Sequence, residues 1–577
     1  MRWTARAAAV TAVTIAAALW CGALHAQTEQ QVDACNGKGN PPVDTVIDGC
    51  TALIQSGRYA GRDLSAVFAI RAAAHYRKGD LDRAIQDYGR AIDLDPAGAL
   101  AYYNRGVAHG SKGDWDRAIQ DYDQAIKHQP NEPAAFRSRG YAYLEKNQLD
   151  RAVQDFDQAV KLDPKDASAF AYRGSVYMRK GELDRAIADY DQALRLDPSN
   201  ATNFYARGFA YGAKEQWDRA IEDYSQALKL NPRLAAAFYS RGFAHQKQDR
   251  LDDAAKDLDQ AIQLDARDAP ALALRGSIHR RKGDLERAID DFSRALAIDA
   301  QDATTFFNRG VAYSGKGQWD AAVRDFDQAI RLQPNDASAF AYRGAAHQRK
   351  GDLDRALQDL DRAIELDDRL AAAFTYRGGV YSMKRDWDRA VRDYSRALEI
   401  DSNDTAASYN RGIAHSRKQQ WDLAVQDFDQ AIRLSPNDAS AFNNRGFARQ
   451  KLDQLDAALV DFDEAVRLDP GYAAAFAFRG GVLLRKGEFD RAIQDYDRAL
   501  QIDPNNATAF YNRGVAHGSL KQWDLAIQDY DRAAELMPNF AAALYGRGVA
   551  REQMGDKAGA DADIAAARQI DPDIGKP

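Results

Sequence analysis

Hydrophobic and polar positions recur along this chain with a period of 34 residues. The dipeptide Arg105-Gly106 returns every 34 residues as far as Arg547-Gly548, without an insertion, and Arg71-Ala72 is its first, altered copy. Fifteen units therefore cover residues 65–574 of the 577. A fixed period of this length is typical of repeat architectures in which each unit is one supersecondary element.

Each unit contains two apolar stripes with helical spacing. We number the positions 1–34, so that Ala99 is position 1 of the second unit. Bulky apolar residues at position 4, glycine at 8 and usually His or Tyr at 11 share one face of a first helix. The second stripe uses positions 17, 20, 24 and 27, as in Trp115, Ala118, Tyr122 and Ala125. The pattern predicts two antiparallel helices of about 13 residues each, roughly 20 Å long.

The ends of the two predicted helices carry turn and capping residues. Gly113-Asp114 at positions 15–16 predicts the turn, with the aspartate capping the second helix, and Pro130 at position 32 stops that helix. Alanine stands at positions 20 and 27 of all fifteen units, which lets the helices approach closely. A lone hairpin would leave its apolar faces in water, so we expect the hairpins to stack on one another.

The pattern of residues resembles the tetratricopeptide repeat family. The shared features are the 34-residue period, glycine at position 8, alanine at 20 and 27, an aromatic residue at 24 and proline at 32. The resemblance implies an all-α fold: a right-handed superhelical solenoid of about fifteen helix-turn-helix repeats, with the first helices lining a concave face. The chain departs from the family at position 7, where arginine replaces the usual leucine, and at position 32 in four units (Ala266, Ala300, Asp368 and Ser402).

The arginine at position 7 is matched in all fifteen units by an aspartate at position 23. The two positions lie about equally far from the turn, so they stand level on adjacent antiparallel helices. We therefore predict an ion pair inside each hairpin that fixes the pairing of its helices. The alternative is a ladder of arginines that binds an anion. The pairs we single out are Arg105–Asp121, Arg139–Asp155 and Arg309–Asp325.

The resemblance also implies that first-helix positions 2, 5, 6, 9, 12 and 13 face the groove. Asparagine at position 6 matches the place where some long family members hold a peptide backbone, and rings at position 5 add apolar area. The alternative is that these side chains are solvated and bind nothing. The groove-binding candidates are Tyr103, Asn104, Tyr205, Tyr239, Phe307, Asn308, Tyr409, Asn410, Asn444, Tyr511 and Asn512.

A second, longer period overlies the first. Tryptophan at position 17 recurs every three units, with Trp387 as an exception. Block duplication explains this period without any function, and a role in the groove is the alternative. The tryptophans that recur every three units are Trp115, Trp217, Trp319, Trp421 and Trp523.

The N-terminal segment precedes the array. Arg2 and Arg6 followed by the apolar stretch 7–20 indicate a secretory signal peptide over residues 1–26. Residues 27–64 are expected to form an N-terminal cap that includes a degenerate half repeat, and 575–577 a short tail. Cys35 and Cys50 are expected to form a disulfide, with two unpaired thiols as the alternative, and export predicts a periplasmic or secreted protein.

Composition and charge narrow the function. Acidic residues outnumber basic ones by 85 to 78, and the net charge is −7, which argues against nucleic acid or an anionic membrane surface as the main partner. Seven of the nine histidines stand at position 11, where they follow the repeat and lack metal-ligand spacing. We find no catalytic motif and expect no cofactor or metal, and no segment after the leader is apolar enough to embed in a membrane.

The sequence thus predicts a non-enzymatic scaffold or assembly factor that binds a protein or extended peptide in its groove. The alternative is a glycan-handling component in which rings guide a polysaccharide during export. An enzyme is the third and least supported class.

Overall fold

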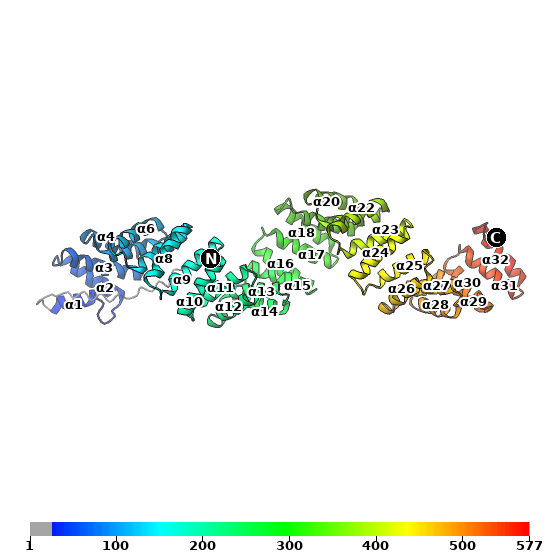
Figure 1. Ribbon diagram of the computed structural model, residues 1–577, viewed down its shortest axis with the longest axis horizontal. Helices are drawn as coiled ribbons and strands as arrows, with labels where there is room; N and C mark the ends of the chain where they lie inside the picture. Colours follow the sequence, from blue (N-terminus) through cyan, green and yellow to red (C-terminus); the bar gives the residue numbers. More distant parts are fainter. Residues whose placement is uncertain (1–25, 576–577) are drawn as a thin grey trace. The chain divides into compact units, whose positions relative to one another are not determined.

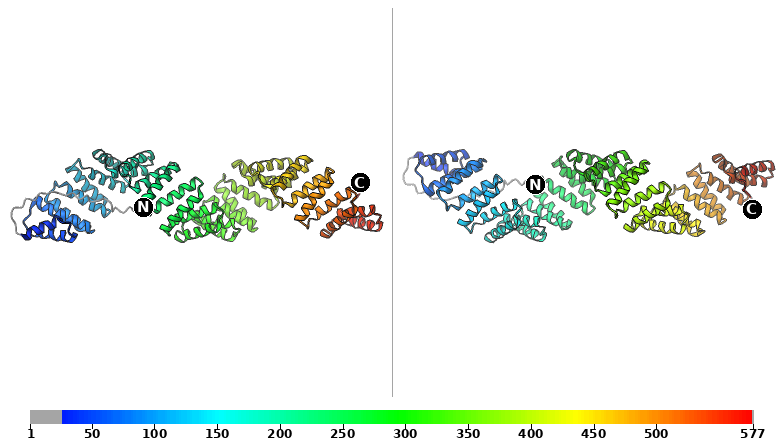
Figure 2. Two further views of the ribbon diagram at one scale, coloured as in Figure 1. Left: turned by 90° about the horizontal axis from the view of Figure 1, so that it is seen from below. Right: turned by 90° about the horizontal axis from the view of Figure 1, so that it is seen from above.

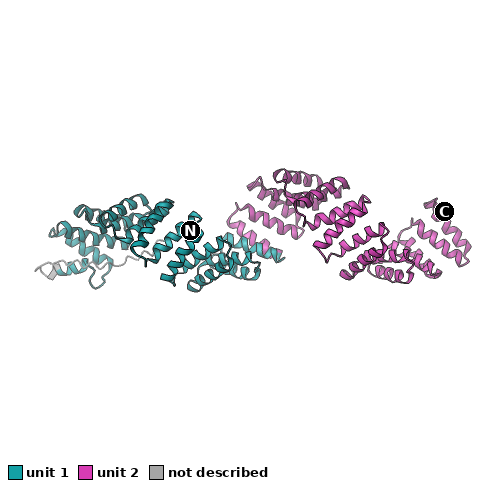
Figure 3. Ribbon diagram, in the orientation of Figure 1, with its two compact units in different colours: residues 1–284 teal, residues 285–577 magenta. Residues whose placement is uncertain are grey.

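The computed structural model describes residues 26–575, so all but the last residue of the predicted signal peptide lies outside the described part. This part contains 32 α-helices joined by short turns, and no residue in it is assigned to a β-strand (Figure 1). The chain divides into two compact units, residues 1–284 and 285–577, with the division between α15 and α16 (Figure 3).

The first unit begins with the pair α1 and α2 and continues as stacked hairpins. Its helices are α1 (Ala26–Cys35), α2 (Val43–Gln55), α3 (Gly61–Lys78), α4 (Leu81–Leu94), α5 (Ala99–Ser111), α6 (Trp115–His128), α7 (Pro133–Glu145), α8 (Leu149–Leu162), α9 (Ala167–Lys180), α10 (Leu183–Leu196), α11 (Ala201–Ala213), α12 (Trp217–Leu230), α13 (Ala235–Lys247), α14 (Leu251–Leu264) and α15 (Ala269–Arg281).

The second unit is built from the same hairpins, which lie side by side in both views of Figure 2. Its helices are α16 (Leu285–Ile298), α17 (Ala303–Gly315), α18 (Trp319–Leu332), α19 (Ala337–Lys350), α20 (Leu353–Leu366), α21 (Ala371–Met383), α22 (Trp387–Ile400), α23 (Thr405–Arg417), α24 (Trp421–Leu434), α25 (Ala439–Lys451), α26 (Leu455–Leu468), α27 (Ala473–Arg485), α28 (Phe489–Ile502), α29 (Ala507–Ser519), α30 (Trp523–Leu536), α31 (Ala541–Gln553) and α32 (Lys557–Ile570).

The turn inside each hairpin depends on a left-handed residue at position 15. Gly113 has φ +79° there, and glycine occupies the same place in several other hairpins. Elsewhere a residue with a side chain adopts this conformation, at a cost of about 1–2 kcal/mol relative to glycine. These residues are Asn147, Glu215, Asp249, Arg385, Gln419, Asp453 and Lys521, whose φ values are 56–62°.

The residue at position 16 caps the second helix only where its side chain is short enough. Asp114 accepts a hydrogen bond from the backbone N–H of Arg117 at the start of α6. Gln148 and Glu182, at the same position in the next two hairpins, form no such side-chain cap. The predicted cap therefore holds for aspartate, which is a preferred N-cap residue because its carboxylate reaches the free N–H groups of the first turn.

The core of most hairpins is a close contact between glycine at position 8 and the side chain at position 24. In the hairpin of α11 and α12, Gly208 lies against the ring of Tyr224, which is buried. Ala220 and Ala227, at positions 20 and 27, are fully buried beside it. The absence of a side chain at position 8 is what lets the first helix approach the ring.

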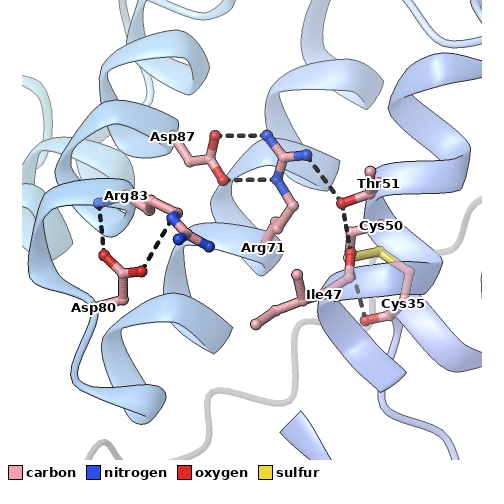
Figure 4. Close-up of polar contacts among 8 residues, drawn as sticks. All are labelled: Cys35, Ile47, Cys50, Thr51, Arg71, Asp80, Arg83 and Asp87. Atoms are coloured by element: carbon pink, nitrogen blue, oxygen red, sulfur yellow. Dashed lines mark hydrogen bonds and ion pairs between the residues drawn. A yellow bond between two sulfur atoms is a disulfide. The ribbon is translucent and has the colours of Figure 1, made fainter. Parts of the chain in front are cut away.

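The N-terminal helices cover the first hairpin. Cys35 of α1 and Cys50 of α2 form a disulfide (Figure 4). Both cysteines are buried with Val46, Leu53 and Val67, the last of which belongs to α3. The segment before the array is therefore folded onto it, and α3 begins at Gly61, before the predicted start of the first unit at residue 65.

None of the helices within residues 26–575 combines the length and the apolar character needed to cross a membrane.

Alanine substitutions in α11 test the packing at position 8. In Gly208→Ala the new Cβ would lie 2.9 Å from Cε1 of Tyr224, so we expect the overpacking to cost about 1–3 kcal/mol. In the control Gly212→Ala, one turn later in the same helix, the nearest atom is 3.5 Å away, and the better helix propensity of alanine is expected to add up to about 1 kcal/mol. Native-state hydrogen exchange of α11 and α12 measures both effects locally, and equal protection in the two variants would contradict the packing argument.

Candidate binding face on the first helices

The predicted groove rings serve first as packing residues. The ring at position 5 lies against the ring at position 24 of its own hairpin, and all of the position-5 rings are half-buried. The distance between ring centroids is 5.8–5.9 Å in each case, which is typical of a stabilising aromatic pair. The pairs are Tyr103–Tyr122, Tyr205–Tyr224, Phe307–Phe326, Tyr409–Phe428 and Tyr511–Tyr530.

Tyr239 differs because position 24 of its hairpin is Leu258. Its ring is half-buried, and burial raises the pKa of its phenol. Burial has the same effect on the pKa values of Tyr409 and Tyr511. These rings therefore present part of their surface to solvent, while the rest belongs to the core.

The predicted asparagines fall into two groups. The side-chain amide of Asn444 donates a 2.8 Å hydrogen bond to the hydroxyl of Tyr409 in the preceding hairpin, so this amide is already engaged. The other four are half-buried, and their amides form no hydrogen bond within the described part of the chain. They are Asn104, Asn308, Asn410 and Asn512, which belong to α5, α17, α23 and α29.

The spacing of the four unpaired amides departs from a continuous ladder. Asn308, Asn410 and Asn512 are each three hairpins apart, and tyrosine, phenylalanine or the engaged Asn444 occupies position 6 between them. The face therefore presents unpaired amides that are separated by hairpins with an aromatic or already bonded side chain at position 6, rather than one free amide per hairpin.

The recurrence of tryptophan at position 17 every three hairpins is explained by its packing against the residue at position 12, which the sequence alone did not lead us to expect. Trp115 lies against Gly110, at position 12 of its own hairpin, where an added Cβ would be 3.2 Å from the indole ring. Every other tryptophan at position 17 also has glycine or serine at position 12, and the exceptional Trp387 is matched by Ser382. The signal was present in the sequence as a correlated pair of positions five residues apart.

A pocket of about 420 Å³ lies on this face near the end of the second unit. It is formed between α29 and α31, with Trp523 and Tyr530 of α30 beneath them. Its lining includes Tyr511, a predicted groove residue, and Tyr545, the position-5 ring of the last hairpin. The remaining lining is mainly small or apolar, which suits an apolar side chain of a ligand.

The arginines at position 7 form the predicted ion pairs with the aspartates at position 23. Arg105 donates to Asp121 through Nε at 3.0 Å and Nη2 at 2.7 Å, and Arg139 and Arg309 bind Asp155 and Asp325 in the same two-point manner. The Asp121 side chain is only 6% exposed. Hydrogen bonding to Asp121 raises the pKa of Arg105, which favours the protonated guanidinium. Figure 4 shows the first member of the series, Arg71 with Asp87.

The remaining nitrogen of most of these arginines reaches the preceding hairpin. Nη1 of Arg139 donates to Asp123 at 2.6 Å, and Nη1 of Arg309 donates to Ser293 at 3.0 Å; both acceptors stand at position 25. The guanidinium also lies over the ring at position 4, with the carbon of Arg139 5.6 Å from the centroid of Phe136. Because its donors are engaged inside the protein, this set of arginines is unsuited to binding an external anion.

The histidines at position 11 belong to the same interior. Nε2 of His245 lies 3.7 Å from a carboxylate oxygen of Asp257, and burial lowers the pKa of His245, as it does those of His109 and His347. Among residues 26–575, no three His, Cys, Asp or Glu side chains are grouped so that they could hold a metal ion.

Family comparisons agree with this geometry. Models of tetratricopeptide repeats match most of the length of the array, and the chain belongs to the tetratricopeptide repeat family. The model described as TPR repeat matches residues 72–113, 211–249, 417–453 and 480–521. Models described as tetratricopeptide repeat match residues 108–165, 137–201, 239–303, 274–343, 439–472 and 507–540. None of these models describes an enzyme.

Solved structures give partial matches. YrrB, described as a TPR protein with an unusual peptide-binding site, is 30% identical over 32% of this chain and 96% of its own, with a TM-score of 0.30. The Cut9–Hcn1 tetramer of the APC/C is 16% identical over 86% and 98%, with a TM-score of 0.40. MamA from Desulfovibrio magneticus RS-1 is 24% identical over 30% and 96%, with a TM-score of 0.28. No curated protein matches the chain in sequence.

Substitutions in the hairpin of α17 and α18 test the ion pair. Arg309→Ala leaves Asp325, whose side chain is 7% exposed, buried without its partner, and we expect a loss of about 3–5 kcal/mol of local stability. The double variant Arg309→Leu with Asp325→Leu removes both charges and is expected to restore most of that loss.

Native-state hydrogen exchange of α17 and α18 measures these effects locally, since long repeat arrays depart from two-state unfolding. Arg331→Ala, an exposed substitution in α18, is the control and should change protection by less than about 0.5 kcal/mol. A double variant as unstable as the single one would show that the guanidinium acts through some contact other than Asp325.

Proposed function

We propose that this protein is a non-enzymatic scaffold or assembly factor that binds an extended protein or peptide along the exposed face of its first helices. The observation that carries the proposal is the set of half-buried, unpaired amides at position 6, exemplified by Asn410. An amide both donates and accepts, which matches the alternating groups of a peptide backbone. The apolar intervals between these amides, and the pocket beyond α29, suit the side chains of such a ligand.

A polysaccharide is the weaker candidate. Glycan binding of this kind depends on open ring faces, and the position-5 rings pack against the rings at position 24 in five hairpins. Because part of each ring is covered in this way, peptide binding is favoured.

Site-specific photo-crosslinking from the face tests this proposal. Photoreactive phenylalanine analogues at positions 308, 410 and 512 are expected to give protein adducts in extracts of the native cell. Mass spectrometry should then map the three adducts to successive segments of one partner, because an extended ligand passes the three positions in order.

The matched control places the same analogue at Gln426, an exposed position on the second helix of the hairpin that holds Asn410. Equal yields from positions 410 and 426 would refute binding on the first-helix face. Adducts that stain as carbohydrate and resist protease would favour the polysaccharide instead.

We further propose that the protein is exported to an oxidising compartment such as a bacterial periplasm. The basic and apolar start of the sequence supports this, as does the buried Cys35–Cys50 disulfide, since disulfides persist in oxidising compartments. In the chain-entropy model, closing a loop of this length contributes about 3 kcal/mol.

Deletion of residues 1–26 tests the localisation. In a bacterial host the full chain should be found in the periplasmic fraction. Cys35 and Cys50, the two cysteines that remain after removal of residues 1–26, should resist alkylation by a maleimide. The deleted form should stay in the cytosol with both thiols alkylated, and its α1 amides should exchange faster. Cytosolic retention of the full chain, with free thiols, would count against export.

A further inference from the structure

Three of the six tryptophans at position 17 pack against an aromatic residue supplied by the next hairpin. Trp115 meets Tyr141 edge-on, with centroids 5.9 Å apart and an interplanar angle of 72°. The same geometry recurs for Trp217 with Phe243 and for Trp421 with Phe447, at 6.0 Å and 5.9 Å. In these three cases the second ring stands at position 9, so this place beside the indole can accommodate an aromatic side chain edge-on.

Trp319, Trp387 and Trp523 lack this ring, and beside Trp523 its place is taken by a pocket. Position 9 of the following hairpin is Val549, and position 6 is Gly546, so neither residue supplies a ring. The ring of Tyr530 occupies the space where a side chain at 546 would begin, with Cζ 2.8 Å from the position of an added Cβ. The 420 Å³ pocket described above occupies this place, and both Trp523 and Val549 line it.

A positive charge is also absent here. Beside Trp115, the carboxylate of Asp116 is paired with Lys146, at position 14 of the next hairpin. Beside Trp523, the corresponding residues are Asp524 and Met554, both exposed, and Asp524 forms no ion pair within residues 26–575. A carboxylate in this position favours a basic group on whatever enters the pocket.

We propose that this pocket binds an aromatic side chain of a partner peptide edge-on to Trp523, and that a lysine or arginine near that side chain pairs with Asp524. The partner ring takes the place that Tyr141, Phe243 and Phe447 occupy beside the other indoles. The inference rests on the proposed function and specifies the chemistry of the peptide at one point of the face.

The C-terminal residues limit access from one side. Ile574 lines the pocket, and Gly575 lies against the ring of Tyr545. Ile574 is half-buried, and the pocket stays open beside it. A ring that enters the pocket would therefore contact Ile574 on one side.

Selection of phage-displayed random dodecapeptides on the full chain tests the proposal. We expect enrichment of peptides that contain an aromatic residue within a few positions of lysine or arginine. An enriched peptide, made synthetically and labelled with fluorescein, should lose about tenfold or more in affinity for Val549→Phe, which supplies the missing ring internally. It should keep its affinity for the control Gln426→Phe, which adds a ring at an exposed position of α24 outside the pocket. Asp524→Asn should weaken binding by a smaller factor, and less at high salt.

Thermal melting shows whether Val549→Phe is folded, and Val549→Tyr, which copies Tyr141, is the substitute if it is not. Enrichment that is the same on Val549→Phe as on the natural chain would overturn the inference. Peptides that bind only after residues 571–577 are removed would show that the chain's own tail is the occupant. Peptides that depend on Asn410 and ignore Val549 would leave the proposed function standing without this pocket, whereas no peptide binding together with no crosslink would reject both.

Discussion

The structure depends on one half-buried guanidinium in each hairpin, held against a buried carboxylate. The arginine at position 7 holds the aspartate of the antiparallel helix with two nitrogens and, in most hairpins, a group of the preceding hairpin with the third, as Arg139 does with Asp155 and Asp123. Planar guanidinium geometry fixes directions as well as distances, so it sets the register inside a hairpin and between neighbours at once. Because this network lies between the two helix layers, first-helix positions 5, 6 and 9 are free to vary.

The helical hairpins and the ion pairs within them were predictable from the sequence, whereas the contacts between neighbouring hairpins were not. The hairpins followed from the period, and the Arg–Asp pairing followed from the symmetry of positions 7 and 23 about the turn. The second partner at position 25 was missed because it belongs to the preceding hairpin, although the frequent aspartate or serine there was a usable signal. The bond from Asn444 to Tyr409 joins residues 35 apart, and no pattern within one unit points to it.

The candidate site arises where the repeat is broken. A regular array fills every place along its face with the same packing, so regularity favours stability and offers a ligand little that is distinctive. The positions that differ, such as Asn410 among aromatic neighbours and Gly546 beneath a pocket, are also those whose polar groups or space the protein itself leaves unused. The recurrence of tryptophan every three hairpins is explained by packing against a small residue, whereas the pocket beside Trp523 is not required by the fold.

Gly89 has a mechanical consequence. It stands at position 25, where the other described hairpins that are followed by a neighbour carry aspartate or serine, so Nη1 of Arg105 has no acceptor there. The junction between the first two hairpins thus lacks the arginine link that the later junctions have, although Tyr76–Ser111 and Lys112–Asp82 still join it. Opening at this junction would therefore break no guanidinium hydrogen bond, and the disulfide-bonded helices α1 and α2 would separate together with the first hairpin as one piece.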